Sequence, residues 1–186
     1  VVKQMPLVIF SGDRVRTKRA SQAVMKLMDG STVLLKEKTL IHFEHPQKQA
    51  VESGTVLYDI RKQGSARGLQ IATKTAIIGV KGTRFLVQEK DGHFSVFLQE
   101  GQLAIEAIKA EFKRVVQQEM DEFAAFKSEF ERYKQQEQKA FKEYVKSLSM
   151  EAGTAISLSA DNELSDIEFN DDVRDMFEEL NQASQL

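Results

Sequence analysis

The segment Gly79-Val80-Lys81-Gly82-Thr83 contains residue types that phosphate-binding loops use. A phosphate loop needs a further glycine upstream and must open a helix, whose N-terminus holds the anion. Here the glycines are three residues apart, and the chain continues as an apolar run from Phe85 to Val87. Glycines inside a strand pattern instead mark a bulge or a position where another backbone passes close by. We therefore predict a structural motif made of Gly79, Gly82, Thr83, Phe85 and Val87.

The other polar residues do not have the pattern of a catalytic or metal site. His42 and His45 are three residues apart on a predicted strand, so they point to opposite faces. The acidic residues of 161–168 lack the central glycine and the terminal glutamate of a calcium loop. The chain has no cysteine, which excludes thiol catalysis and thiolate metal sites. We expect a non-enzymatic protein with no catalytic residue, metal or cofactor.

Charge is unevenly distributed along the chain. Residues 1–105 carry 16 basic and 9 acidic side chains, whereas residues 150–186 carry one arginine and 10 acids. The basic segment 61–68 could present Arg61, Lys62 and Arg67 to an anionic partner, and a solvated turn is the alternative. Two interpretations of the acidic tail remain open. It is either solvated, or residues 161–180 dock near these three cations while the apolar side chains Val173, Met176, Phe177 and Leu180 become buried.

Residues 1–105 alternate in short apolar runs separated by turn residues, which indicates an all-β domain. A two-residue turn at Asp91-Gly92 places Phe85 opposite Leu98 and Val87 opposite Val96, and Leu86 opposite Phe97 on the other face. Because both faces are apolar, this hairpin is expected at the centre of a small sandwich or solenoid. Gly54 is expected to turn the chain between two further strands.

The segment Asp29-Gly30-Ser31 allows two hairpin registers. A two-residue turn sets Leu27 opposite Thr32, whereas a three-residue loop with a glycine bulge sets Leu27 opposite Val33 and Met25 opposite Leu35. The second register gathers apolar residues on one face, and we adopt it.

From residue 106 to residue 150 the apolar period changes to that of a helix, and the segment has no glycine or proline. This pattern predicts a long amphipathic helix with an uncovered aromatic stripe, as in a coiled coil, and such a stripe needs a second copy, another protein region or a fold-back partner. The predicted stripe consists of Val116, Phe123, Phe126, Phe130, Tyr133, Phe141 and Tyr144. Gly153 is expected to cap this helix. Residues 155–158 form a weak strand or loop, and a short acidic helix is predicted at 171–181 with Asn170 as its N-cap.

Four motifs occur in an order that resembles the FecR-domain family: Gly12-Asp13-x-Val15-x-Thr17, Asp29-Gly30-Ser31, Ile78-x-Val80-x-Gly82-Thr83-x-Phe85-x-Val87 and Val96-x-x-x-Glu100-Gly101. The resemblance covers roughly residues 7–105. It implies a compact, non-enzymatic all-β module of the periplasm, of the type found in iron-dicitrate sensors and sigma regulators. In sigma-regulator members an anti-sigma segment and a membrane helix precede the domain, and a receptor-signalling module follows it. We expect neither the anti-sigma segment nor the membrane helix in this chain, and we expect a long helix in place of the receptor-signalling module.

Together these features predict an α+β chain in three parts: an all-β domain at 1–105, a long helix at 106–150 and an acidic tail at 151–186. The expected function is a sensory or regulatory scaffold in the bacterial cell envelope that acts through protein contacts, including self-association through the long helix to an oligomer. The alternative is a module in which the basic β domain binds peptidoglycan or lipopolysaccharide. Nucleic acid is not expected as a partner, and no apolar run is long enough to span a membrane. A signal peptide or anchor is expected to be removed or to lie outside the chain.

Overall fold

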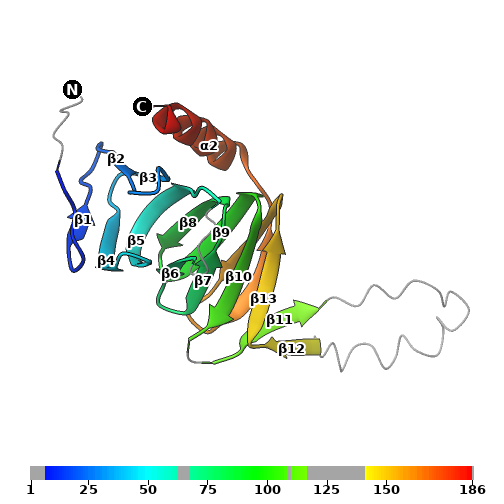
Figure 1. Cartoon of the computed structure of the whole chain (residues 1–186). Helices are drawn as coiled ribbons and strands as arrows, with labels where there is room; N and C mark the ends of the chain where they lie inside the picture. The colour runs from blue at the N-terminus through cyan, green and yellow to red at the C-terminus, as the bar shows by residue number, and fades with distance from the viewer. Residues whose placement is uncertain (1–6, 63–67, 109, 117–140, 186) are drawn as a thin grey trace, which may run out of the picture.

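The computed structural model describes residues 7–62, 68–108, 110–116 and 141–185, and only the backbone at 115–116 and 141–143. The described chain is mostly β, with strands joined in one 15-stranded sheet and a C-terminal helix (Figure 1). The strands are β1 (Arg14–Arg16), β2 (Ala23–Lys26), β3 (Thr32–Leu35), β4 (Leu40–His45), β5 (Lys48–Asp59), β6 (Leu69–Ala72), β7 (Ala76–Val80), β8 (Arg84–Lys90), β9 (His93–Glu100), β10 (Gln102–Ala107), β11 (Phe112–Val116), β12 (Phe141–Val145), β13 (Ser147–Glu151), β14 (Thr154–Leu158) and β15 (Glu163–Ile167). The helix is α2 (Asp171–Ser184).

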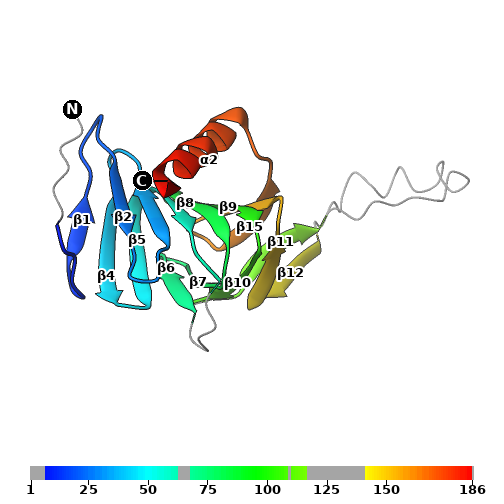
Figure 2. The same ribbon diagram turned by 45° about the horizontal axis from the view of Figure 1, so that its top comes forward.

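The sheet folds over itself into two layers, as a nearly closed barrel (Figures 1 and 2). The layer that we call the β7 layer contains β1, β4, β6, β7, β10, β13 and the first half of β5. The β8 layer contains β2, β3, β8, β9, β14, β15, β11, β12 and the second half of β5. Gly54 lies at the point where β5 passes from one layer to the other, with φ of +90°. The predicted turn at Gly54 is therefore wrong, because the glycine bends one continuous strand.

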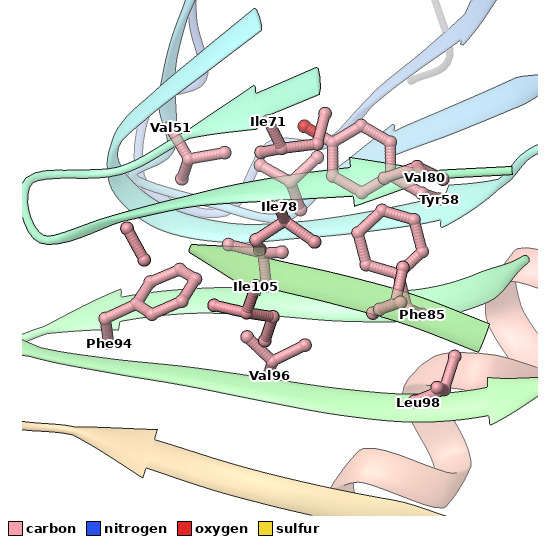
Figure 3. Packing of buried hydrophobic residues seen from close by; sticks show 14 of the residues in the cluster. Val51, Tyr58, Ile71, Ile78, Val80, Phe85, Phe94, Val96, Leu98 and Ile105 are labelled. Carbon is pink, nitrogen blue, oxygen red and sulfur yellow. The ribbon is translucent and has the colours of Figure 1, made fainter. Parts of the chain in front are cut away.

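The main hydrophobic core lies between the two layers (Figure 3). The rings of Tyr58 and Phe85 stack within it, with centroids 4.7 Å apart. The Tyr58 hydroxyl is buried and finds no hydrogen-bond partner among the described residues. Burial raises the pKa of this phenol, because the charged form would lose its hydration. The core between the two layers is therefore mainly apolar.

The β8–β9 hairpin has the predicted register. Phe85 is opposite Leu98, Leu86 is opposite Phe97, and Val87 is opposite Val96. Asp91 and Gly92 both have positive φ, as a two-residue type I′ turn requires. Phe85 and Val87 contribute to the core between the layers, whereas Leu86 faces the other side of the sheet and is buried there as well. The central position predicted for this hairpin is confirmed.

The β2–β3 hairpin differs from both predicted registers by a small shift. Met25 is opposite Val33, and the Leu27 amide bonds to the Ser31 carbonyl at 2.9 Å. The loop does contain three residues with a glycine in the left-handed region, but it consists of Met28, Asp29 and Gly30. Relative to the register that we adopted, in which Met25 is opposite Leu35, the pairing is shifted by two residues. Such a shift keeps every side chain on its predicted face, so Met25, Val33 and Leu35 are still buried together.

The predicted long helix is wrong at both of its ends. Residues 112–116 and 141–145 form the paired strands β11 and β12. Residues 147–151 form β13, which pairs with β10, and β10 itself reaches into the predicted helix at residues 106–107. Burial in β13 alternates with period two, since Met150 is buried between the exposed residues Ser149 and Glu151, and Phe112 on β11 is buried as well. Pairing between distant segments therefore prevails over the local helical period. The middle of the predicted helix, residues 117–140, lies outside the described residues.

The sheet continues across residue 105, where the β domain was predicted to end. β14 pairs with β9, and β13 pairs with β10, so residues after 140 complete the same two layers. Gly153, the predicted helix cap, instead lies in the turn between β13 and β14 with φ of +84°. The short acidic helix is confirmed as α2, and the Asn170 side chain accepts a 2.9 Å hydrogen bond from the Val173 amide. No helix in the described ranges is long and apolar enough to cross a membrane.

Candidate interaction surfaces

Helix α2 lies across the outer face of the β8 layer, opposite the main core (Figures 1 and 2). Its buried anchors are Val173, Phe177 and Leu180, each with at most 3% of its surface exposed. They form a second hydrophobic cluster with outward-facing residues of five strands: Leu34, Leu57, Leu86, Phe97 and Ala155. Phe169, before the helix, packs its ring edge-on against Phe97 at 5.5 Å between centroids. This outer face therefore recognises an amphipathic helix.

Polar contacts surround the apolar anchors of α2. The ammonium group of Lys36 on the β3–β4 connection lies 2.5 Å from Glu179 Oε2, and Gln22 donates to the same oxygen at 3.0 Å. The Lys26 ammonium donates to the backbone carbonyls of Ala183 and Ser184 at 3.2 and 3.1 Å. The helix has no basic residue in its own last turn, so a strand lysine stabilises the negative end of the helix dipole.

A polar cleft of about 560 Å³ lies between the end of α2 and the sheet. Arg84 at the start of β8 is its central cation, and its guanidinium donates to the Asn181 side chain of α2. The carboxylates of Asp59 and Glu100 each lie 3.9 Å from that guanidinium, at the outer limit of an ion pair. Asp59 also accepts a 2.8 Å hydrogen bond from Ser184. The polar contacts around the cleft thus help to hold the C-terminal end of α2 on the sheet.

A second hollow, the basic groove, lies where the chain leaves β1. It has a volume of about 390 Å³ and is lined almost entirely by carbon atoms of Arg16, Thr17, Lys18, Arg19 and Lys38. All four cations are exposed, and within the described ranges no carboxylate forms an ion pair with any of them. Their neighbours Arg14 and Lys36 are paired, with Glu52 and Glu179. The four cations around the groove therefore have no carboxylate partner among the described residues.

The glycine motif lies in and beside the β7–β8 connection, between two strands. Gly82 has φ of +64°, and a side chain there would lie 3.0 Å from the Lys62 Cα atom. Gly79 has room for an ordinary contact with Ala104, so close packing restricts only Gly82 of the two. Thr83, Phe85 and Val87 are all buried. A strand follows the motif, so the helix N-terminus of a phosphate loop is missing at this position.

The predicted basic face is only partly described. Arg61 and Lys62 are exposed, while Arg67 lies outside the described residues. The Arg61 amide bonds to the Ser31 hydroxyl at 3.0 Å, and its guanidinium passes over Gly30. Neither residue forms a hydrogen bond or an ion pair with α2 in the described chain. The acidic helix instead contacts Lys26, Lys36 and Arg84.

The remaining candidate residues lie apart from these surfaces. His42 and His45 are on β4, and His93 is exposed at the start of β9. The structure groups no three metal-ligating side chains in the part of the chain that it describes. From the aromatic stripe, Val116 and Phe141 are opposite each other on β11 and β12, and Tyr144 on β12 is 59% exposed. Phe123, Phe126, Phe130 and Tyr133 lie outside the described residues.

The sequence analysis did not predict the cations that contact helix α2. The cations that contact α2 are far apart in the sequence: Lys26, Lys36 and Arg84. They reach the same helix only because strand pairing places β2, β3 and β8 in one layer. The basic groove had a local signal, since residues 14–19 read Arg-Val-Arg-Thr-Lys-Arg. That run, with four cations in six residues, could have been singled out beside the segment 61–68.

Comparison with known proteins places these features in context. The model of the family described as FecR protein matches residues 13–104. No curated protein matches the sequence. Two crystal structures of a proposed anti-sigma factor from Parabacteroides distasonis ATCC 8503 superpose with a TM-score of 0.56 at 13% identity. The superposition covers 85% of this chain and 60% of that protein, so the chain spans less than two thirds of its neighbour. At this identity the likeness concerns the fold.

Proposed function

Through residues 13–104 this chain belongs to the FecR protein family, and from that premise we propose that it is a sensory or regulatory module of the bacterial cell envelope. It acts through protein–protein contacts and carries out no catalysis. The structural neighbour from Parabacteroides distasonis, a proposed anti-sigma factor, supports a regulatory role of this kind. An envelope location, on the periplasmic side, agrees with the family resemblance of the four sequence motifs.

The observation that carries the proposal is the helix-binding outer face of the β8 layer. Helix-in-groove recognition uses apolar anchors at helical spacing, and α2 presents Val173, Phe177 and Leu180 in that way. The face is built by strands of the FecR domain, β3, β5, β8 and β9, whereas the helix comes from outside the matched residues. The FecR domain therefore has a surface that recognises protein helices.

The apolar surface extends beyond the area that α2 covers. Val24 on β2 pairs with Leu34, so both side chains point to the outer face. Leu34 is buried under the helix, but Val24 remains 41% exposed. Val24 therefore leaves apolar area beside the helix that a further partner could bury. We propose that a partner protein contacts the outer face here, beside α2.

Site-specific photo-crosslinking in bacterial cells that carry the full protein tests this function. A photoreactive amino acid replaces Val24 on the outer face, and Lys90, an exposed residue at the end of the β8–β9 hairpin, serves as the control. The proposal predicts one discrete protein adduct from position 24 in the envelope fraction and no such adduct from position 90. Absence of an adduct from position 24, or equal adducts from both positions, would contradict it.

A further inference from the structure

Strand β2 is an open edge of the β8 layer (Figure 1). Within the described ranges it pairs with β3 and with no other strand. The Leu27 amide donates to the Ser31 carbonyl, so these two opposite residues form a hydrogen-bonded pair of the hairpin. In an antiparallel ladder such pairs alternate with pairs whose backbone groups point away from the partner strand. The backbone N–H and C=O groups of Val24 and Lys26 therefore point to the open edge.

The pairing of β3 with β5 leads to the same assignment. The Lys36 amide donates to the Thr55 carbonyl, so the even-numbered residues of β3 bond to β5 and its odd-numbered residues bond to β2. In the part of the chain that the structure describes, no hydrogen bond reaches the backbone of Val24 or Lys26. An edge of this kind offers its free donors and acceptors to a further strand.

The side chains of β2 leave this edge unprotected at its centre. Natural edge strands are commonly protected by charged side chains, and β1 follows this rule, because both of its exposed residues are arginines, Arg14 and Arg16. On β2 the central outward side chain is Val24, which is 41% exposed. The only cation of β2, Lys26, directs its ammonium group to the last carbonyls of α2.

A second copy of the chain fits this edge. Antiparallel pairing of two β2 strands about a twofold axis at Val24 places this valine opposite its own copy and Gln22 opposite Lys26. The open backbone groups of each copy then meet the open groups of the other, because the residues in register are all even-numbered. On the inner face the same axis places Ala23 opposite Met25, so apolar side chains meet on both faces of the seam.

The same twofold operation does not suit the edge at β1. It would place Arg14 of one copy opposite Arg16 of the other, and like charges that face each other across two strands are destabilising. No like charges face each other in the β2 seam, where a carboxamide is opposite Lys26. Of these two edges, β2 is therefore the one that can pair with itself.

We propose that two copies of this chain join their β8 layers at β2 into one continuous sheet. A twofold axis perpendicular to the sheet keeps the two α2 helices on the same outer face. The seam is short, since β2 has only four residues, so the dimer is weak and depends on concentration. This inference concerns the edge of the sheet and goes beyond the proposed function, which concerns its outer face and a different protein.

Sedimentation equilibrium of the purified full chain, over about a hundredfold range of concentration, tests the dimer. Val24→Lys places two lysines opposite each other at the axis and should weaken dimerisation by about tenfold or more. Val8→Lys is the matched control, because it makes the same substitution at another exposed valine, which lies outside β2. It should dimerise with the dissociation constant of the wild type.

A cysteine variant tests the register and keeps the test valid if Val24→Lys disturbs folding. The chain has no cysteine of its own. Hydrogen-bonded pairs in antiparallel sheets have Cα atoms about 5.5 Å apart, within the range of about 4.4–6.8 Å that a disulfide spans. Val24→Cys should therefore form a disulfide-linked dimer under mild oxidation. Met28→Cys, at the exposed tip of the β2–β3 hairpin and outside the seam, should remain a monomer.

Three results would overturn the proposal: a wild-type chain that is monomeric at every concentration, equal dimerisation of Val24→Lys and Val8→Lys, or equal disulfide formation by the two cysteine variants. The dimer and the proposed function fail separately, because the purified chain needs no other protein to dimerise. A monomeric chain that still forms an adduct with a different protein from position 24 would show that a foreign protein occupies this edge. The function would then stand without the dimer.

Discussion

Two cationic regions of this protein differ in how their charge is compensated. On the outer face of the β8 layer, Lys36 is paired with Glu179, Lys26 bonds to the last carbonyls of α2, and Arg84 bonds to Asn181. In the basic groove, four cations have no described carboxylate partner. Helix α2 therefore contacts the cations of the first region and leaves those of the second without a described carboxylate partner.

The difference arises from apolar anchors, since the helix docks where its hydrophobic stripe can be buried. Phe177 and Leu180 are at most 1% exposed against the sheet, and burying side chains of this size contributes about 2 kcal/mol each. Exposed ion pairs contribute at most about 1 kcal/mol each. Apolar contact therefore selects the docking face, and charge only refines it. Net charge alone does not identify which basic surface an acidic segment will cover.

Removing an apolar anchor of α2 is expected to have the largest effect. Phe177→Ala should lower the free energy of unfolding by about 3 kcal/mol, because it leaves a cavity against Phe97 and Phe169 in a fully buried cluster. Chemical denaturation measures the change. Arg174→Ala, on the exposed side of the same helix, is the control and should stay within about 0.5 kcal/mol of the wild type. Equal effects in the two variants would show that α2 is held by charge or not held at all.

Gly54 on β5 packs against Thr39, the residue that links the basic groove to β5. A side chain there would lie 2.5 Å from the Thr39 Cα atom, and the residue has φ of +90°. Gly54→Ala is therefore expected to cost about 2 kcal/mol or more in thermal unfolding. Gly12→Ala is matched in backbone conformation, with φ of +93° and nothing within 4 Å, and should cost only about 1 kcal/mol. If Gly54→Ala is no worse than Gly12→Ala, Thr39 does not pack tightly against β5.

The ionic contribution to α2 docking should be small and sensitive to salt. Glu179→Gln removes the charge that faces Lys36 while keeping the length of the side chain. We expect a loss of up to about 1 kcal/mol in low salt that decreases as the ionic strength approaches about 1 M, where charges are screened beyond about 3 Å. Denaturation at both ionic strengths provides the measurement. A loss comparable to that of Phe177→Ala would reverse the ranking of apolar and ionic contacts.

Relieving strain in the groove should produce the smallest change, with the opposite sign. Ala20→Gly removes the Cβ atom from a residue at φ of +54°, so it should raise the melting temperature slightly, by an amount equivalent to about 0.5 kcal/mol. A variant that melts earlier than the wild type would show that the Ala20 conformation carries no strain.

The sequence predicted the parts of this fold that depend on local chemistry. Asp91-Gly92 determines its own turn and hence the register of β8 and β9, and Asn170 caps α2 through a bond three residues away. The apolar residues by which α2 docks were also predictable, because they follow a helical period. Each of these signals is contained within about twenty residues of chain.

The errors concern features that only distant pairing decides. The segment from residue 106 to residue 150 has a helical period, but its ends pair with β7, β10 and each other as strands. The docking cations Lys26, Lys36 and Arg84 come from three separate strands or connections, so no local pattern unites them. Lys38 joins Arg16 and Arg19 in the groove only because Thr17 and Thr39 link the two segments.

Hydrogen exchange of the full chain, read by mass spectrometry at low and high salt, tests most directly whether apolar burial or charge holds α2 on the sheet. The account predicts that the amides of α2 exchange slowly at both salt concentrations, because apolar burial holds the helix on the sheet. Fast exchange of α2 at high salt would contradict it.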